Sequence, residues 1–300
     1  MRKRLLHILL FLLAFVCVDR LIGWGLNVGL NRYFGLTQHS EVLFVGHSHL
    51  MLAVDKEGFE QGTATEVSKY CRGGVNVADR LEMVRQFLAS PYSDSLKVVI
   101  YGVDQFMFTG EGLSMNSYKL FYPFMDESHI DHYIRRSTDL YDYLTHKSIC
   151  SLRYSDALLN SSIRGWAGNW ENYKIGKLDV IALEKQVAQN AQRHIKFEPA
   201  LIESFEQTLR LLTSKGITVI LVNTPIAKPL NGYEPELYSR FIQYMQRKDA
   251  SSTHIIYWDL NPAFSDHYDL FFDPIHLNVE GQRVINEELV KRFNAIKNQL

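Results

Sequence analysis

Four short apolar segments recur along the chain, and each is rich in β-branched or aromatic residues. They are EVLFV (41–45), KVVIY (97–101), ITVILV (217–222) and HIIYW (254–258). Because these segments are apolar almost throughout, they resemble strands that are buried on both faces of a parallel sheet. We therefore predict strands of a parallel sheet at these positions.

Amphipathic segments lie between and after these runs. Residues 199–216 carry apolar side chains at helical spacing and end at Gly216, as helices commonly do. Residues 235–249 and 279–298 show the same spacing. Strands that alternate with helices indicate an α/β fold, here a three-layer α/β/α sandwich around a parallel sheet.

The segment from about 106 to 195 interrupts this alternation. It is rich in Tyr, Ser, Asp and Asn, and its hydrophobic periodicity is weaker. We interpret it as a partly helical insertion in the α/β domain. It is either a lid or wall of the functional site or a subdomain without a role there.

The N-terminus combines positive charge with a long apolar stretch. MRKR precedes an apolar run over residues 5–18, and after Asp19 and Arg20 the apolar character resumes over 21–30. The first run alone is shorter than the roughly 20 residues that cross a bilayer, but the whole stretch is long enough. Basic residues on this flank favour a cytoplasmic N-terminus, with the rest of the chain on the far side.

We therefore predict an uncleaved membrane anchor over 1–30 and an extracytoplasmic α/β domain over 31–300. The alternative is a cleaved signal peptide, for which Gly23 and Gly25 form a small-x-small pair near the expected place. Cys71 and Cys150 are too few for a disulfide scaffold, although they could pair with each other.

Composition excludes several classes of function. The formal net charge is −1, and outside the first residues no dense stripe of Lys and Arg occurs. Such a chain lacks the positive field that attracts nucleic acid, so we expect no nucleic-acid partner.

Three residues are of the types that acyl transfer requires. Ser48 follows the first predicted strand, and Asp273 and His276 precede the last helix in FFDPIHLNVEG. A serine hydroxyl becomes a good nucleophile when an imidazole takes its proton, and a carboxylate holds that imidazole in the right tautomer. Functional residues collect beyond the carboxyl ends of parallel strands, where the first strand delivers Ser48. The Ser48 segment is not the G-x-S-x-G turn of α/β-hydrolases, because Leu50 stands at the second glycine.

These stretches resemble the SGNH (GDSL-type) hydrolase superfamily. DPIHLNVEG is similar to the last block of that superfamily, while FVGHSHLMLAVD and VVIYGVDQF resemble membrane-anchored extracytoplasmic SGNH-like proteins. The resemblance covers roughly 41–106 and 215–295. It implies an SGNH, flavodoxin-like fold, no cofactor, and the acylation of cell-surface polymers beside a membrane-bound O-acyltransferase.

The resemblance also implies roles for individual residues. Ser48 would be the nucleophile and donate its N–H to the oxyanion, His276 the base, and Asp273 the residue that orients it. A second oxyanion donor would come from Gly73, Gly74 or Asn76.

The chain departs from the family pattern at two places. His47 stands where the family usually has Asp, and Asp104 stands where it offers an Asn side chain. An ionised carboxylate facing an oxyanion would be repulsive, and loss of one donor can cost on the order of 3 kcal/mol in the transition state. This departure predicts slow chemistry, a different donor such as Gln105, or a site kept for binding.

Simpler interpretations exist for the polar residues after the first strand. Ser48 could be only a helix N-cap. His47 and His49 could bind zinc with Asp273 and His276, but side chains two positions apart on a helix diverge, so we predict no metal site. Substrate contact or solvent exposure is the expectation for both histidines.

The sequence thus predicts serine-dependent chemistry on acyl esters of an envelope glycan, either an acylated polysaccharide or a lipid-linked glycan. Water as acceptor would make the protein an esterase, and a sugar hydroxyl would make it an O-acyltransferase. The alternative is a catalytically weak accessory protein that works with a membrane-bound O-acyltransferase.

Overall fold

The computed structural model describes residues 2–110, 112–189 and 193–299. Parts of the predicted insertion, residues 111 and 190–192, lie outside this set. The chain divides into two compact units: a helical unit, Met1–Thr37 with Asn116–Asn169, and an α/β unit, Gln38–Met115 with Trp170–Leu300. The predicted division into 1–30 and 31–300 with an insertion over 106–195 stays a prediction.

A parallel sheet forms the centre of the α/β unit. Within the described residues it has five strands in the order β2 (Val67–Cys71), β1 (Val42–Gly46), β3 (Val98–Val103), β4 (Thr218–Asn223) and β5 (Ile255–Asp259), and all neighbours are parallel. The four strands expected from the apolar runs are confirmed as β1, β3, β4 and β5. The predicted α/β class with a parallel sheet is therefore confirmed.

Strand β2 was not expected from the sequence, because it carries polar residues where the other strands are apolar. Ser68 and Lys69 are buried in it. The Ser68 hydroxyl is 2.9 Å from the Ser40 hydroxyl, and Lys69 Nζ donates to the carbonyl of Val54 at 2.5 Å. Hydrogen bonds that only the tertiary structure supplies thus make these side chains acceptable in a buried strand.

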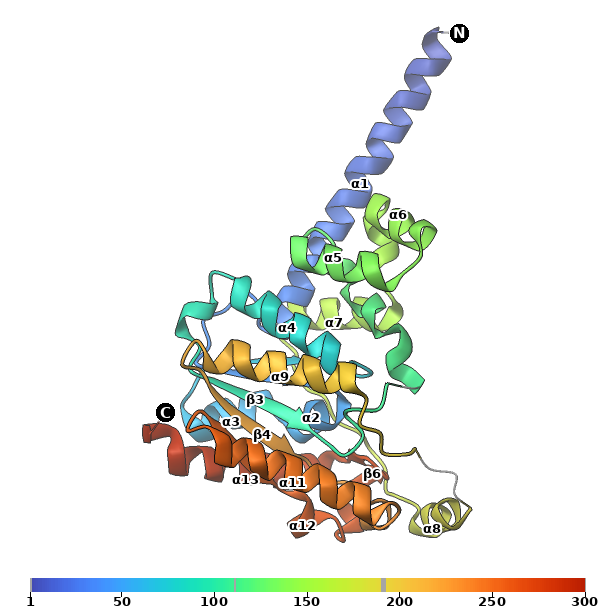
Figure 1. Ribbon diagram of the computed structural model, residues 1–300. Helices are drawn as coiled ribbons and strands as arrows, with labels where there is room; N and C mark the ends of the chain where they lie inside the picture. Colours follow the sequence, from blue (N-terminus) through green and yellow to red (C-terminus); the bar gives the residue numbers. More distant parts are fainter. Residues whose placement is uncertain (1, 111, 190–192, 300) are drawn as a thin grey trace. The chain divides into compact units, whose positions relative to one another are not determined.

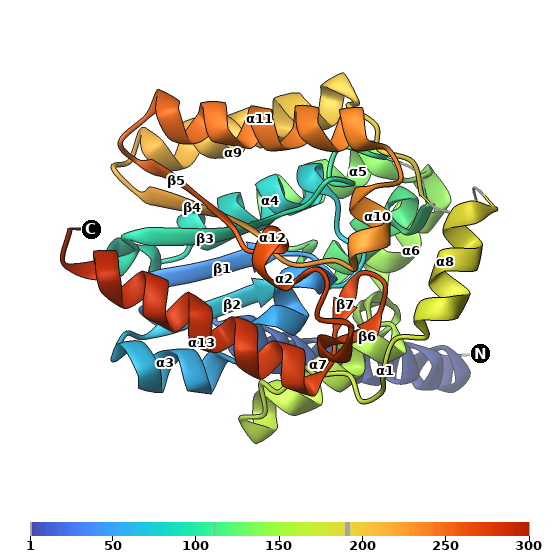
Figure 2. The ribbon, with the colours of Figure 1, turned by 90° about the horizontal axis from the view of Figure 1, so that it is seen from below.

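Helices cover both faces of the sheet (Figures 1 and 2). One face holds α2 (Ser48–Ala53), α3 (Lys56–Thr63) and α13 (Val279–Ile296), and the other holds α4 (Val77–Ala89), α9 (Pro199–Thr213) and α11 (Pro235–Ser251). The helices predicted over 199–216, 235–249 and 279–298 are confirmed as α9, α11 and α13.

Aromatic contacts occur in the core on both faces of the sheet. Phe59 packs edge-on against Phe44 of β1, with ring centroids 5.0 Å apart, and also contacts Phe293 of α13. On the opposite face Tyr101 of β3 contacts Phe205 of α9 at 5.6 Å. The alternate residues of each strand therefore face different layers, as a sheet buried on both sides requires.

Shorter elements complete the α/β unit. They are α8 (Val180–Ala188), α10 (Lys228–Asn231), α12 (Asn261–Phe264), the antiparallel pair β6 (Phe271–Asp273) and β7 (His276–Leu277), and the 3-10 turns η1 (Ser93–Ser95), η4 (Tyr268–Leu270) and η5 (Lys297–Gln299).

The helical unit consists of α1 (Arg2–Phe34), α5 (Ser128–Ser137), α6 (Leu140–Ser148) and α7 (Asp156–Ala167), with η3 (Cys150–Arg153) and the Asn116–Phe124 part of η2 (Gly112–Phe124). Helix α1 is long and apolar enough to cross a membrane, a property that signal sequences share. Its C-terminal part packs against α7 and η3.

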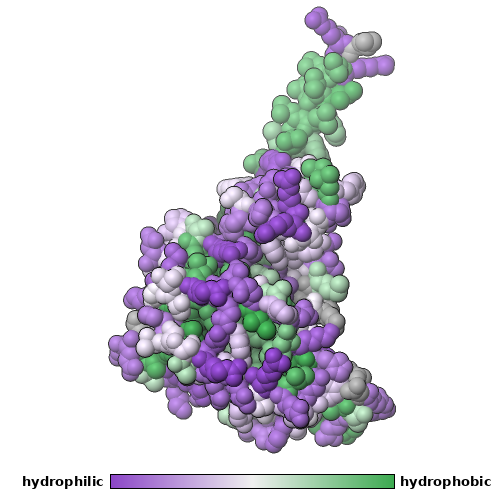
Figure 3. Space-filling view, in the orientation of Figure 1, coloured by the Kyte–Doolittle hydropathy of each residue, from purple (hydrophilic) through white to green (hydrophobic). Residues whose placement is uncertain are grey.

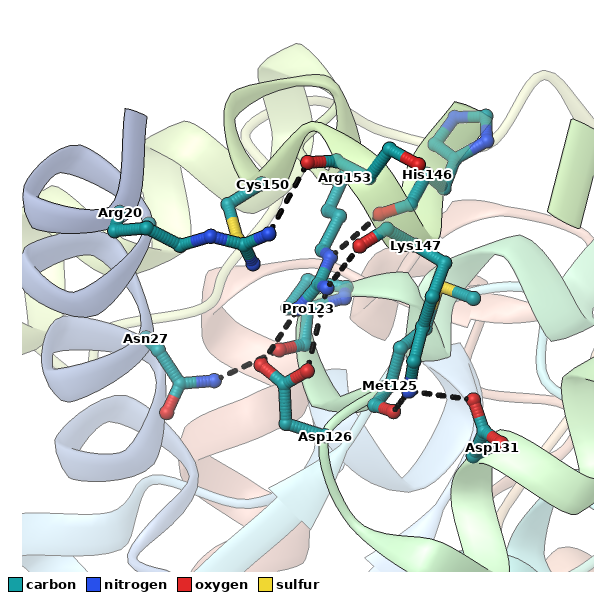
Figure 4. A network of polar contacts seen from close by, with 12 residues as sticks. Arg20, Asn27, Pro123, Met125, Asp126, Asp131, His146, Lys147, Cys150 and Arg153 are labelled. Atoms are coloured by element: carbon teal, nitrogen blue, oxygen red, sulfur yellow. Dashed lines mark hydrogen bonds and ion pairs between the residues drawn. The ribbon is translucent and has the colours of Figure 1, made fainter. Parts of the chain in front are cut away.

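Polar contacts join α1 to the rest of the helical unit (Figure 4). Arg20 donates to the Cys150 sulfur and to the Ser148 carbonyl, and Asn27 donates to the Pro123 carbonyl at 3.0 Å. In the described part of the chain Cys150 and Cys71 are both free thiols.

A buried arginine holds the surrounding loops together. The Arg153 guanidinium donates to both carboxylate oxygens of Asp126 and to the carbonyls of His146 and Lys147 (Figure 4). Lys147 in turn donates to Asp131. Such bidentate, charge-assisted bonds are among the stronger polar contacts in proteins, so this unit has an organised polar interior.

Candidate active site

The strand order creates a switch point between β1 and β3, from which the chain builds outward in opposite directions. Ser48 follows β1 and Asp104 follows β3. Ligands of open α/β sheets bind beyond the carboxyl ends of the strands at such a point. The topology therefore brings these two segments, distant in sequence, to one functional edge.

The structure brings together the three residues expected to perform catalysis. Ser48 Oγ lies 2.7 Å from His276 Nε2, and His276 Nδ1 lies 2.8 Å from Asp273 Oδ2. A carboxylate only accepts hydrogen bonds, so Nδ1 carries the imidazole proton and Nε2 is the acceptor for the serine hydroxyl. This is the geometry that a serine nucleophile and its base require.

A short hairpin presents Asp273 and His276. Asp273 ends β6 and pairs in register with His276, which begins β7. Asp273 Oδ1 accepts from the backbone N–H groups of Ile275 and His276, at 3.0 and 2.9 Å. Burial opposes ionisation of Asp273, but the His276 ring and these N–H groups outweigh it and lower the pKa of the carboxyl.

Asn278 fixes the hairpin to the helix that follows. Its side-chain oxygen accepts from Gly281 N at 2.9 Å and so caps α13, while its Nδ2 donates to the Asp269 carbonyl at 2.7 Å. One side chain thus pairs with a backbone N–H at the start of α13 and with a backbone carbonyl just before the hairpin.

Ser48 is the first residue of α2 and not its N-cap. The cap is His47, whose Nδ1 accepts from His49 N at 3.1 Å. The interpretation of Ser48 as only a capping residue is therefore wrong, because the hydroxyl points to His276 instead.

Asp104 is engaged by the protein at both oxygens. Its Oδ2 lies 2.5 Å from His47 Nε2, and its Oδ1 accepts from Phe106 N at 2.8 Å. Burial favours the neutral acid, but the neighbouring His47 and the Arg80 charge more than compensate and hold the pKa of Asp104 far below its usual range. The side chain anchors His47 and is not an unpaired charge.

The two histidines do not behave as expected. Their rings contact each other, with centroids 4.3 Å apart, because His47 is a cap residue outside the helix. The expectation that they diverge is therefore wrong. His49 is buried and His47 is half-buried, and both line the cavity beside Ser48, so the alternative expectation of substrate contact stays a prediction. Burial lowers the pKa of both imidazoles, so they are neutral at pH 7.

The hydrogen bonds of His47 and Asp104 affect whether this group of residues can bind a metal ion. Donor atoms of His47, His49 and Asp104 lie within 4.8 Å of one another, a grouping that could hold a metal ion. Both nitrogens of His47 are, however, already used, one accepting from His49 N and the other bonded to Asp104. The arrangement as found is a hydrogen-bonded cluster.

Gly74 and Asn76, the candidate oxyanion donors, both line the same cavity as Ser48. Gly74 has a φ of +83°, a conformation that favours glycine. Asn76 caps α4: its Oδ1 accepts from Asp79 N, and its own N–H donates to Asp79. The reciprocal cap fixes the orientation of the Asn76 amide. Their role as donors stays a prediction.

Gln105, suggested as a substitute donor, is directed elsewhere. It is buried, and its Nε2 donates to the carbonyl of Leu230 at 3.3 Å. One N–H of the Gln105 amide is thus used by Leu230, and a role for Gln105 at the oxyanion stays a prediction.

The cavity beside Ser48 has a volume of about 430 Å³, within the range of small-molecule sites. Apolar side chains form much of its wall, namely Val75, Phe106, Met107, Leu230, Pro274 and Ile275. Gln186 and Arg193 also line it, so part of the segment predicted as an insertion does reach the site.

Arg80 is a component that the sequence did not indicate. It is buried at the cavity, donates to the Gly102 carbonyl at 2.6 Å, and lies over the Tyr101 ring. Its charge partly offsets Asp104. Its position four residues after the α4 cap was the available signal, since that turn faces the carboxyl edge of the sheet.

Comparison with known proteins provides little independent information. No protein-family model matches the chain, and no curated protein matches it. Among solved structures, one from Streptococcus pneumonia, provisionally described as a platelet activating factor, covers 97% of this chain and 99% of its own at 9% identity and a TM-score of 0.41. A TM-score this low does not establish a shared fold.

Proposed function

We propose that the protein is a serine-dependent enzyme acting on acyl esters, of SGNH type. The observation that carries this proposal is the hydrogen-bonded series Ser48–His276–Asp273 at the edge of a ligand-sized cavity. The chemistry uses side chains and backbone alone and needs no cofactor.

In the first half-reaction Ser48 Oγ attacks the acyl carbonyl carbon as His276 Nε2 takes the hydroxyl proton. The ester C–O bond then breaks, and His276 returns this proton to the leaving alkoxide, so that an acyl-serine remains. Asp273 stabilises the imidazolium that forms transiently. The Ser48 N–H, at the start of α2, is the first candidate donor to the oxyanion, and Gly74 or Asn76 the second.

In the second half-reaction an acceptor hydroxyl attacks the acyl carbon while His276 Nε2 takes the acceptor's proton. The bond between that carbon and Ser48 Oγ then breaks, and His276 returns the proton to Ser48 Oγ. Water as acceptor completes hydrolysis, and a sugar hydroxyl completes O-acyl transfer. We propose an envelope glycan, either a polysaccharide or a lipid-linked glycan, as the source or acceptor of the acyl group. Helix α1 supports this location, because it would hold the enzyme at the membrane with its basic N-terminus in the cytoplasm.

The experiment that tests the serine chemistry is labelling of the full chain in detergent with a fluorophosphonate probe. We expect labelling of the wild type, and its loss in Ser48→Ala and in His276→Ala. Ser204→Ala, at a half-buried serine of α9 whose hydroxyl donates to the Ala200 carbonyl, is the matched control and should label normally. A folded wild type that does not label, or labelling that survives Ser48→Ala, would contradict the proposal.

A second candidate is a catalytically weak accessory protein that binds polymer beside a membrane-bound O-acyltransferase. Asp104 favours it, because a carboxylate bonded to His47 stands where the resembled family offers an Asn donor. Binding of the glycan by a protein that is inert to the probe, retained in Ser48→Ala, would support this candidate over the enzyme.

A further inference from the structure

Helix α6 directs its polar side chains toward the rest of the helical unit. Asp142 accepts from Tyr122 Oη at 2.7 Å, and His146 stacks on the Tyr122 ring with centroids 4.0 Å apart. Tyr143 donates to Asp131 at 3.0 Å. The inner side of this helix is therefore held by hydrogen bonds and polar rings.

The outer side of α6 carries three large apolar side chains, beside the small exposed Ser148. Leu140 is 68% exposed, Tyr141 82% and Leu144 50%. At 100° per residue these side chains fall within an arc of about 100°, and positions 142 and 146 lie on the opposite side. A helix that faces water has the reverse arrangement, with apolar side chains inward and polar ones outward. The pattern indicates that the outer side of α6 faces a medium other than water.

The exposed apolar stretch of helix α1 indicates how thick that medium is. Its exposed large apolar side chains run from Leu5 to Trp24. A helix rises 1.5 Å per residue, so this stretch is about 30 Å long, which matches the hydrocarbon core of a bilayer. Asp19 and Arg20 therefore fall within the stretch, near its C-terminal end.

Other parts of the helical unit meet α1 at this level. The Asp19 carboxylate accepts from Cys150 N and Ser151 N, both at 2.8 Å, and is almost fully buried. Arg20 donates to the carbonyl of Ser148, the last residue of α6. The polar groups within the apolar stretch are thus satisfied by η3 and the end of α6, as groups at membrane depth require.

Aromatic and apolar side chains continue around this level. Leu152 of η3 is 50% exposed, directly after the N–H groups that bind Asp19. Trp24 is 66% exposed, and Trp166, 48% exposed, donates from Nε1 to the Gly25 carbonyl. Trp and Tyr with a bonded polar end are typical of the membrane–water interface. In Figure 3 a hydrophobic patch lies on the helical unit beside the apolar part of α1.

We propose that the helical unit is seated in the bilayer surface, with the outer side of α6 and Leu152 in the interfacial layer of the lipid. This lipid-facing edge consists of Leu140, Tyr141, Leu144 and Leu152. The occupant is lipid, not a second protein. The inference rests on α1 being a membrane span and is independent of the serine chemistry.

Nitroxide labels test whether the outer side of α6 contacts lipid. The full chain is labelled and reconstituted in vesicles of phosphatidylcholine with a minor share of phosphatidylglycerol. Labels at Tyr141→Cys and Leu144→Cys are compared with Leu13→Cys on α1 and Lys215→Cys, an exposed position of the α/β unit. All are made in a Cys17→Ser background. The remaining thiols are buried, and burial raises the pKa of Cys71 to about 12, so they react slowly.

Power saturation with oxygen, which partitions into lipid, and with a water-soluble nickel complex reports the surroundings of each label. We expect positions 141 and 144 to show several-fold higher oxygen-to-nickel accessibility than position 215, approaching position 13. If the label at position 13 is in lipid while those at 141 and 144 behave like the label at 215, α1 spans the membrane but the outer side of α6 does not contact lipid. Protection of 141 and 144 from both relaxants would show a protein cover and overturn the lipid assignment. Water-like behaviour at position 13 would overturn both the membrane span of α1 and the lipid contact of α6. The fluorophosphonate result does not depend on any of these outcomes.

Discussion

Asp273 performs two tasks with its two oxygens. Oδ2 holds the His276 ring, and Oδ1 holds the backbone of the turn that carries that ring. The residue therefore fixes the tautomer of the base and the shape of the hairpin together. An amide at this position can replace one of these contacts but not both, because its nitrogen cannot accept a hydrogen bond.

We expect Asp273→Asn to lower kcat for p-nitrophenyl acetate by about 10³- to 10⁴-fold, because the imidazole loses the partner that holds its tautomer. Asp269→Asn, an exposed carboxylate nearby, is the control and should retain normal turnover. Steady-state kinetics with both purified variants check this. Less than a tenfold loss would remove Asp273 from the catalytic machinery.

Asp104 should contribute to stability in a pH-dependent way. We expect Asp104→Asn to lower the free energy of unfolding at pH 7 by about 2 kcal/mol, the scale of a hydrogen bond to a charged group. The folded pKa of Asp104 lies below its ordinary 3.8, so its contribution is present above that value and is lost as the pH falls through the folded pKa.

Urea unfolding at several pH values checks the Asp104 prediction. The difference between wild type and Asp104→Asn should shrink as the pH falls below about 4. Asp94→Asn, at an exposed position, should show no such difference. A difference that is constant with pH would mean that Asp104 is not ionised in the folded protein.

At the scale of elements, the hairpin of β6 and β7 depends on close contact with α13. A Cβ on Gly281 would lie 2.1 Å from the Leu270 carbonyl oxygen, just before β6. Because that atom belongs to the backbone, the hairpin or the helix has to move. The position of His276 is therefore set partly by a glycine five residues downstream.

We expect Gly281→Ala to reduce fluorophosphonate labelling at least tenfold and to lower stability by about 1–3 kcal/mol, the usual cost of overpacking. Gly232→Ala is the matched control, because its Cβ would meet only the Pro229 carbonyl oxygen at 3.9 Å. Labelling rates and urea unfolding measure the two effects. Wild-type labelling in Gly281→Ala would show that the hairpin is not positioned by this contact.

At the scale of the whole molecule, α1 and its flanking charges predict which side of the membrane carries the site. Arg2, Lys3 and Arg4 precede the apolar stretch, so we expect the α/β unit on the extracytoplasmic side. In a Cys17→Ser background, Lys215→Cys should react with a membrane-impermeant maleimide on intact cells. Reaction only after lysis, with equal amounts of protein, would place the α/β unit in the cytoplasm.

Much of the fold could be predicted because its signals are local. The apolar runs of β1, β3, β4 and β5 and the periodicity of α9, α11 and α13 are properties of neighbouring residues. Strand β2 was not predicted, because burial of Ser68 and Lys69 depends on hydrogen bonds to Ser40 and to the Val54 carbonyl. A pattern within one segment contains no information on such partners.

The sequence by itself determined the α/β class, the apolar N-terminal helix and the identity of Ser48, Asp273 and His276 as candidates, because residue type and spacing along the chain are sufficient for these. Only the tertiary structure decided that these three side chains meet, that Asp104 binds His47, and that α6 shows its apolar side outward. The physical reason is that hydrogen bonds and burial depend on distances in space, which the packing of β1, β3 and the hairpin creates between residues far apart in the chain.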